Sequence, residues 1–341
     1  MMQEIISRIT SGEDLVPDQA YQVMRSIMTG SATPAQVGAF LAAMRLKGES
    51  FQELLACARV MQEYVVPIPA VAGSNRLVDT CGTGGDGTGS FNISTASALV
   101  TAGAGVPVVK HGNRGVSSRC GSADVMKALG VTIEITPVHA TKVLQRAGMV
   151  FLYAPLYHPA MSGVAGVRRE LGIRTIFNLL GPLSNPAGAG VRLLGVYDPA
   201  LTEKIALVLS ELGVYRAMVV HGDGMDEIST TGPTRVTELD NGAVRTYILH
   251  CEDFGIPPAV KSDLLGGSPD ENAGIIRRVL EGAASPARDI ILLNAGAAIY
   301  LGGKSATLTD GIRCAARSVD SGRARAVLDS LIRYTGENDD T

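Results

Sequence analysis

Residues 76–111 read RLVDTCGTGGDGTGSFNISTASALVTAGAGVPVVKH. A short apolar segment at 76–81 is typical of a strand, and it leads into a glycine-rich loop. A run of small residues at 94–105 predicts a helix, and a second apolar segment at 106–111 predicts another strand. A strand, a helix and a strand in this order predict two parallel strands joined by a crossover helix.

The same alternation continues toward the C-terminus, which predicts an α/β fold whose central, mostly parallel sheet is covered by helices. Residues 229–249 favour irregular β structure, and residues 269–336 favour three helices. Further strands are expected at 131–135, 149–155, 191–198 and 215–222, and further helices at 122–130, 137–148 and 201–213.

The chain before residue 67 has a helical pattern instead. Thr33 precedes Pro34, and Ser50 stands three residues before Glu53, so both serve as helix start signals. Prolines and a glycine at 67–73 indicate a linker. An all-helical segment therefore precedes the α/β region.

The composition excludes several classes of protein. With 30 Lys+Arg against 33 Asp+Glu the net charge is −3, which favours neither nucleic acid nor an anionic membrane as a partner. The five cysteines form no C-x-x-C pair, so we expect no disulfide framework, no zinc site and a reducing, cytoplasmic compartment. The N-terminus lacks the pattern of a signal peptide. The apolar stretch at 290–301 is too short to span a bilayer and predicts a buried helix.

The loop Gly82–Gly87, GTGGDG, formally matches the dinucleotide fingerprint G-x-G-x-x-G. That interpretation needs an acidic residue about 20 positions later, but no Asp or Glu lies between Gly87 and Ala123. A Walker loop is excluded because Thr88 stands where its lysine would be. Apart from Cys120, the ionisable side chains of this interval are Lys110, His111, Arg114 and Arg119. Glycine N–H groups, a helix start and basic side chains together predict a site for a phosphate-bearing anion.

Three further features each allow two interpretations. Asp226 and Glu227 follow a predicted strand. Their carboxylates either bind a Mg²⁺ ion that substrate phosphates also contact, or form an acidic loop exposed to solvent. His111 either contacts substrate or is a structural loop histidine. Ser117 and Ser118 lack an identifiable His/Asp partner set, so their hydroxyls are better explained as donors to phosphate.

Over essentially its whole length, the sequence resembles the anthranilate phosphoribosyltransferase family, which joins anthranilate to phosphoribosyl pyrophosphate (PRPP). The family's diphosphate loop appears at Gly82–Asp86, its following helix start at Asn92–Thr95, and its basic loop at Lys110–Arg114, continuing to Asp124. The longest specific match is HPAMSGVAGVRRELGIRTIFNLLGPLSNPA at 158–187. Ser90 stands where the family often has Thr, which keeps the hydroxyl.

The resemblance implies the site residues. Anthranilate would be bound by Gly82, His111, Asn113 and Arg168, and magnesium, with two ions expected, by Ser94, Asp226 and Glu227. Catalysis would be electrostatic and positional, with Lys110 and Arg168 supporting it and no residue acting as acid or base. PRPP would be bound by Gly82, Gly85, Asp86, Ser90, Asn92, Ile93, Ser94, Thr95, Lys110, His111, Gly112, Asn113, Arg114, Gly115, Val116, Ser117, Ser118 and Ser122.

The resemblance also implies the domain organisation. A small helical domain would comprise 1–72, completed by about 165–184, and a large α/β PRPP-binding domain would comprise 73–164 and 185–341. The site would lie between the domains, and homodimers would form through the helical one. Three rival interpretations are a pyrimidine nucleoside phosphorylase-like enzyme, which works without magnesium, a non-catalytic nucleic-acid-binding relative, and an NAD-dependent oxidoreductase.

Overall fold

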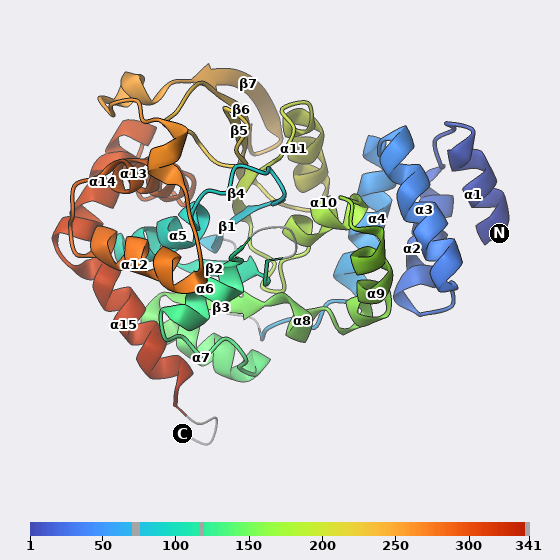
Figure 1. The fold of residues 1–341 in the computed structure, drawn as a ribbon, viewed down its shortest axis with the longest axis horizontal. Helices are drawn as coiled ribbons and strands as arrows, with labels where there is room; N and C mark the ends of the chain where they lie inside the picture. Colours follow the sequence, from blue (N-terminus) through green and yellow to red (C-terminus); the bar gives the residue numbers. More distant parts are fainter. Residues whose placement is uncertain (70–75, 116–118, 338–341) are drawn as a thin grey trace. The chain divides into compact units, whose positions relative to one another are not determined.

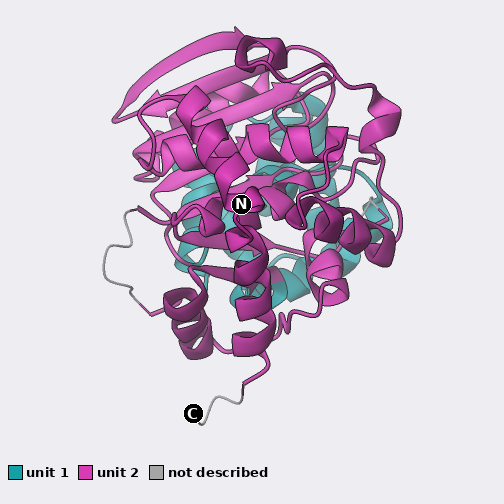
Figure 2. Ribbon diagram, turned by 90° about the vertical axis from the view of Figure 1, so that its left-hand side faces the viewer, with its two compact units in different colours: residues 1–66, 155–186 teal, residues 67–154, 187–341 magenta. Residues whose placement is uncertain are grey.

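The structure is a computed structural model that describes residues 1–69, 76–115 and 119–337. It divides into two compact units, which Figure 2 colours separately. The helical unit comprises Met1–Val66 and Pro155–Pro186, and the α/β unit comprises Pro67–Ala154 and Ala187–Thr341. The predicted domain limits of 72 and about 165–184 stay a prediction; residue 72 lies outside the described residues.

The helical unit contains helices from two separate parts of the chain. The predicted start signals are confirmed, because the side chain of Thr33 accepts from Gln36 N at 3.3 Å and that of Ser50 accepts from Glu53 N at 3.3 Å. Its elements are α1 (Met2–Thr10), α2 (Pro17–Met28), α3 (Pro34–Lys47), α4 (Phe51–Glu63), most of α8 (Ala154–Tyr157), η2 (Pro159–Met161), α9 (Ser162–Leu171) and α10 (Ile176–Leu183).

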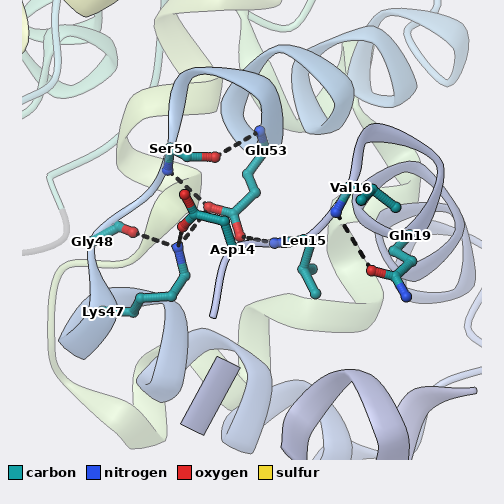
Figure 3. A network of polar contacts seen from close by, with 8 residues as sticks. All are labelled: Asp14, Leu15, Val16, Gln19, Lys47, Gly48, Ser50 and Glu53. Atoms are coloured by element: carbon teal, nitrogen blue, oxygen red, sulfur yellow. Dashed lines mark hydrogen bonds and ion pairs between the residues drawn. The ribbon is translucent and has the colours of Figure 1, made fainter. Parts of the chain in front are cut away.

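A buried carboxylate joins two of these helices to the connection that precedes α2 (Figure 3). Glu53, at the start of α4, has no exposed surface. Its two oxygens accept from Leu15 N at 2.9 Å, from Ser50 N at 2.8 Å and from Lys47 Nζ at 2.8 Å. Lys47 ends α3 and also pairs with Asp14. The network therefore fixes the connection before α2 against the last residue of α3 and the first turn of α4.

The α/β unit is built on one seven-stranded sheet in the order β3-β2-β1-β4-β5-β6-β7 (Figure 1). The first five strands in this order are parallel, and β6 and β7 are antiparallel. This arrangement confirms the predicted fold class. The strands are β1 (Val78–Gly82), β2 (Val108–Gly112), β3 (Met149–Tyr153), β4 (Val191–Gly195), β5 (Arg216–Gly222), β6 (Thr234–Asp240) and β7 (Ala243–Leu249).

Helices cover the two faces of this sheet. Figure 1 shows α5, α13 and α14 on one side and α11 on the other. The predicted buried helix at 290–301 is confirmed as part of α13, which packs against α5 and α14. The helical elements of the unit are α5 (Ile93–Gly103), α6 (Ser122–Ala128), α7 (Pro137–Ala147), α11 (Leu201–Glu211), η3 (Cys251–Phe254), η4 (Lys261–Leu264), α12 (Pro269–Leu280), α13 (Pro286–Leu301), α14 (Leu308–Asp320) and α15 (Arg323–Thr335).

Residues 131–135 are not a strand, so that prediction was wrong. Val131, Ile133 and Ile135 are all buried, which explains the alternating pattern. The backbone of this segment pairs with no strand of the sheet, and Thr132 N donates instead to Thr335 Oγ1 at 3.1 Å. A segment that buries alternate side chains without joining a sheet has the same apolar alternation as a strand.

Two other predictions also differ from the structure. The β structure predicted for residues 229–249 is present, but it is regular rather than irregular, because β6 and β7 pair as antiparallel strands. The segment 269–336 forms four helices rather than three, because Gly322, with φ +76°, separates α14 from α15 by a very short turn.

None of the helices in 1–69, 76–115 and 119–337 is long and apolar enough to cross a bilayer. All five cysteines lie in the described residues, and none of them forms a disulfide bond.

Candidate active site

The predicted phosphate and metal residues of the α/β unit follow the carboxyl ends of neighbouring parallel strands. The glycine loop begins at the last residue of β1, the basic loop begins within the last three residues of β2, and the acidic pair Asp226–Glu227 follows β5. Strands β2, β1, β4 and β5 are consecutive in the sheet. Their carboxyl ends therefore meet at one edge, where open α/β sheets bind ligands.

Hydrogen bonds join the acidic pair to the glycine loop and to the start of α5. Gly84 N donates to Asp226 Oδ2 at 2.7 Å, and Ser94 N donates to Glu227 Oε1 at 3.0 Å. The backbone N–H of Asp226 donates to Asp86 Oδ2 at 3.4 Å. The glycine loop and the start of α5, which together form the predicted phosphate cradle, are therefore hydrogen-bonded to the predicted metal ligands in one cluster.

Glycine is required where the strands approach Asp226. Gly82 ends β1 and pairs with Gly195, which ends β4. A Cβ at Gly82 would overlap the carboxylate of Asp226, and a Cβ at Gly195 would overlap its carbonyl oxygen. Glycine at these two positions therefore leaves room for the acidic loop.

The backbone conformation of the glycine loop excludes most other residue types. Gly84, Gly85, Gly87 and Gly89 all have positive φ, between 63° and 78°. Within the loop, Asp86 accepts from Thr88 N at 3.1 Å and from Thr88 Oγ1 at 2.9 Å. The loop is therefore a series of tight turns whose glycines let a ligand approach the backbone closely.

Lys110 lies at the centre of the cluster and is only 2% exposed. Its ammonium group donates to Thr80 O and, at 3.2 Å, to Ser94 Oγ. Burial lowers the pKa of Lys110, whereas the nearby charges of Asp79 and Glu227 raise it. Asp79 also pairs with Arg192 at 2.6 Å below the site.

The first turn of α5 contributes Ile93, Ser94 and Thr95. The Ile93 side chain is buried in the core, so only its backbone can face a ligand. The hydroxyl of Thr95 is buried and has no hydrogen-bond partner among the described residues. An N-terminal helix turn with an uncommitted hydroxyl suits an anion.

Backbone groups of the basic loop form hydrogen bonds with the first residues of α6. Asn113 O accepts from Ala123 N at 3.1 Å and from Ser122 Oγ at 3.3 Å, and Asp124 accepts from Gly115 N at 3.0 Å. Arg114 Nε donates to Tyr153 OH at 3.0 Å.

His111 is 9% exposed, and a Cβ at Gly112 would overlap Ser122. The predicted PRPP residues Val116, Ser117 and Ser118 lie outside the described residues.

Residues 264–266, which no sequence motif assigned to the site, lie against the glycine loop. Leu264 O accepts from Phe91 N at 3.0 Å, and Gly266 N donates to Gly89 O at 2.8 Å. Ser90 and Leu265 form an isolated β-bridge. The Gly266–Gly267 pair was the only local signal of this approach.

Electrostatics favour a cation beside the acidic pair. Burial and the neighbouring charge of Asp86 raise the pKa of Asp226 to about 7. Burial and the charge of Asp226 raise the pKa of Glu227 well above its usual range. Nearby carboxylates that repel one another are stabilised in their charged form by a divalent ion.

The available donors fit magnesium better than a softer metal. They are the carboxylates of Asp226 and Glu227 and the hydroxyl of Ser94, all of which are oxygen ligands. No group of three or more His, Cys, Asp and Glu side chains in the described part of the chain forms a complete metal cage. Magnesium commonly takes one or two carboxylates and completes its shell with water and substrate phosphates.

Arg168 belongs to the helical unit, whereas the other predicted site residues that the structure describes belong to the α/β unit. It lies near the end of α9, with its guanidinium carbon 5.4 Å from the centre of the Phe177 ring. Burial lowers the pKa of Arg168. The side chain is therefore held against an apolar surface rather than extended into solvent.

Comparisons with known proteins agree with this arrangement. Residues 74–325 match the family model described as "Glycosyl transferase family, a/b domain", and residues 3–65 match "Glycosyl transferase family, helical bundle domain". The fold and the site thus define a glycosyl transferase built from a helical bundle and an α/β domain.

Relatives make the assignment narrower. An anthranilate phosphoribosyltransferase of Methanocorpusculum labreanum is 52% identical over 341 residues, covering 100% of both chains. That of Moorella thermoacetica is 51% identical and covers 98% of each. The crystal structure of the Thermus thermophilus enzyme is 43% identical, with a TM-score of 0.91 over 97% of this chain and 99% of that one. The Saccharomyces cerevisiae enzyme in complex with PRPP and Mg is 27% identical, with a TM-score of 0.88 over 98% and 97%. The chain belongs to the anthranilate phosphoribosyltransferase family.

Proposed function

We propose that the chain transfers the 5-phosphoribosyl group of PRPP to the amine of anthranilate, giving N-(5-phosphoribosyl)anthranilate and diphosphate. The observation that carries this proposal is the bonding of Asp226 to Gly84 N and of Glu227 to Ser94 N. These bonds hold two carboxylates, which we propose as metal ligands, beside the loop that we propose binds the diphosphate leaving group. The names of the relatives and the yeast complex support the same reaction.

The α/β unit would hold PRPP. The N–H groups of the glycine loop, the first turn of α5, Lys110 and the basic loop provide donors for its phosphates. Magnesium would be held by Ser94, Asp226 and Glu227, and we propose two ions. When bound, magnesium supplies positive charge that neutralises diphosphate oxygens.

The demanding step is the departure of diphosphate from C1 of the ribose. The C1–O bond breaks with its electron pair passing to diphosphate, while the amine nitrogen forms the new bond to C1 and then loses a proton. Anthranilate has a neutral aromatic amine, so no strong base is needed before attack. Preorganised donors such as Lys110 and the loop N–H groups stabilise the charge that develops on the leaving group.

The carboxylate of anthranilate needs a cationic partner. Arg168 offers a planar guanidinium that bonds a carboxylate through two N–H groups. Gly82, His111 and Asn113 are proposed to contact the same substrate. Correct orientation of the amine toward C1 would supply the remaining rate enhancement.

We also propose a cytoplasmic homodimer that associates through the helical unit. Leu46, in α3 of that unit, is 89% exposed, so its substitution probes a contact through this unit without disturbing the core. Sedimentation at micromolar concentration, compared between the chain and Leu46→Asp, tests the association. A monomeric parent chain would refute it.

A pyrimidine nucleoside phosphorylase-like activity is the second candidate. It would use free phosphate and a nucleoside without magnesium, so the acidic pair beside the phosphate cradle counts against it.

The experiment that tests the proposed function follows the fluorescence of anthranilate with PRPP and Mg²⁺ present. We expect fluorescence to be lost only when all three are combined with the protein. An unchanged signal with all three would refute the proposal, and phosphorolysis of uridine or thymidine would favour the second candidate.

A further inference from the structure

A chain of hydrogen bonds connects three segments around the predicted PRPP site. Asn272, in the first turn of α12, is only 2% exposed. Its Oδ1 accepts from Gly267 N at 2.8 Å, and its Nδ2 donates to Asn92 Oδ1 at 2.9 Å. Asn92 Nδ2 in turn donates to Cys120 O at 3.1 Å. The side chain of Asn92 therefore ties the start of α5 to two other segments.

Backbone groups at both ends fix the donor-to-acceptor direction of this series of hydrogen bonds. An N–H group begins it at Gly267 and a carbonyl oxygen ends it at Cys120, so each amide has one orientation that satisfies its neighbours. Turning either amide over would place two donors or two acceptors against each other. The thiol of Cys120 adds a further contact to Asn92 Oδ1 at 3.3 Å.

The packing around Asn272 is tight as well. A Cβ added to Gly266 would lie 2.8 Å from Asn272 Oδ1 and 2.8 Å from the Cα of Phe91. Phe91 immediately precedes Asn92, and Gly266 N already donates to Gly89 O. The segment 264–272 is thus packed directly against the C-terminal end of the glycine loop.

We propose that Asn272 is a positioning residue for PRPP binding that acts through Asn92. This inference rests on the proposed function. Asn272 aligns Asn92, and Asn92 sets the first turn of α5, with Ser94 and Thr95, against the segment that contains Cys120. Loss of Asn272 should therefore weaken PRPP binding without a comparable effect on anthranilate.

The test compares Asn272→Ala and Asn272→Asp with the parent chain. Both variants should raise the KM for PRPP about tenfold and change the KM for anthranilate less than twofold. The aspartate is nearly isosteric and keeps the bond from Gly267 N, but it sets an acceptor against Asn92 Oδ1, so it should not rescue PRPP binding. It also keeps the test open if the alanine variant folds poorly.

Thr335→Val is the matched control for a purely structural effect. Thr335 is 4% exposed, accepts from Thr132 N and donates to Leu331 O, so its loss removes comparable buried hydrogen bonds elsewhere. It should lower the melting temperature while leaving the KM for PRPP unchanged. In the double variant Asn92→Ala with Asn272→Ala, the loss of PRPP affinity should not exceed that of Asn92→Ala alone.

Unchanged PRPP affinity in both Asn272 variants would overturn the inference, as would equal increases in both KM values or additive losses in the double variant. Calorimetric titration with PRPP and Mg²⁺ separates this outcome from failure of the proposed function. A parent chain that binds PRPP but forms no product would refute the proposed reaction alone, and the calorimetric affinities of the variants would still decide the role of Asn272.

Discussion

The side chain of Asn294 hydrogen-bonds both backbone groups of Ile228, the residue directly after the acidic pair. Asn294 Oδ1 accepts from Ile228 N at 3.0 Å, and Asn294 Nδ2 donates to Ile228 O at 2.8 Å. Asn294 lies within α13 and has no exposed surface. A core helix thereby holds the backbone that presents Asp226 and Glu227, in the way that a neighbouring strand would.

Replacing Asn294 with alanine should cost both stability and metal affinity. Two buried backbone groups of Ile228 would lose their partner, which costs about 2–4 kcal/mol of unfolding free energy. Because the acidic loop would be released, the apparent Mg²⁺ affinity should fall several-fold. Urea unfolding and a Mg²⁺ titration of the rate measure the two effects. Ser318→Ala, which removes a buried bond to Val100 O, should lower stability without changing the Mg²⁺ titration.

Gly195→Ala tests the close approach of β4 to the acidic loop. The new Cβ would overlap the backbone of Asp226, which has no flexible group that can move aside. We expect at least a tenfold loss of kcat/KM for PRPP together with a higher Mg²⁺ requirement. Gly181→Ala is the control, since nothing lies within 4 Å of its Cβ and alanine favours a helix. If Gly195→Ala kept full activity, the packing at Asp226 would have to be looser than the structure shows.

Features that depend on neighbouring residues were predictable from the sequence. The capping signals at Thr33 and Ser50, the glycine loop and the acidic pair are all local patterns, and parallel strands bring their carboxyl ends to one edge. Asn272 and Asn294 were not predictable as parts of the site. Each is a single polar residue in a helix, and its partner is 180 or 66 positions away. Only the tertiary structure shows which buried amide faces which loop.

The buried carboxylate of Glu53 should matter more than its exposed neighbour Asp14, although both contact Lys47. Glu53→Gln would leave the buried ammonium of Lys47 without its adjacent buried charge, at a cost of about 2–4 kcal/mol. Asp14 is 64% exposed in its side chain, so Asp14→Asn should cost less than about 1 kcal/mol. Denaturant unfolding of the two variants measures the difference. Equal losses would show that the buried charge of Glu53 contributes no more to stability than the exposed charge of Asp14.

His158 should make stability depend on pH. Burial lowers the pKa of His158 to about 4, although its bond to the Ser184 backbone acts in the opposite direction. The unfolded chain has a histidine pKa near 6.5 and takes up the proton first, so stability should fall as the pH drops from about 6.5 to 4 and be constant above. The largest contribution is about 3 kcal/mol.

Unfolding at several pH values measures this contribution as a difference between chains. His158→Gln should flatten the decline below pH 6.5, whereas His250→Gln, at an exposed position, should keep it. If the two variants had the same pH profile, the titration of His158 would not contribute to stability.

Arg168 should determine the affinity for anthranilate rather than for PRPP. Its guanidinium packs on Phe177, and burial lowers its pKa, so it is less well hydrated than a surface arginine. Arg168→Ala should raise the KM for anthranilate at least tenfold while leaving the KM for PRPP within twofold. Arg168→Lys should recover only part of the affinity, because an ammonium group does not bond a carboxylate through two parallel N–H groups. Arg169 is exposed and serves as the matched control, for which Arg169→Ala should change neither KM.

The same comparison with aniline, which has the amine but no carboxylate, makes the assignment specific: Arg168→Ala should affect its turnover far less than that of anthranilate. An equal effect on both amines would remove the carboxylate of anthranilate as the partner of Arg168.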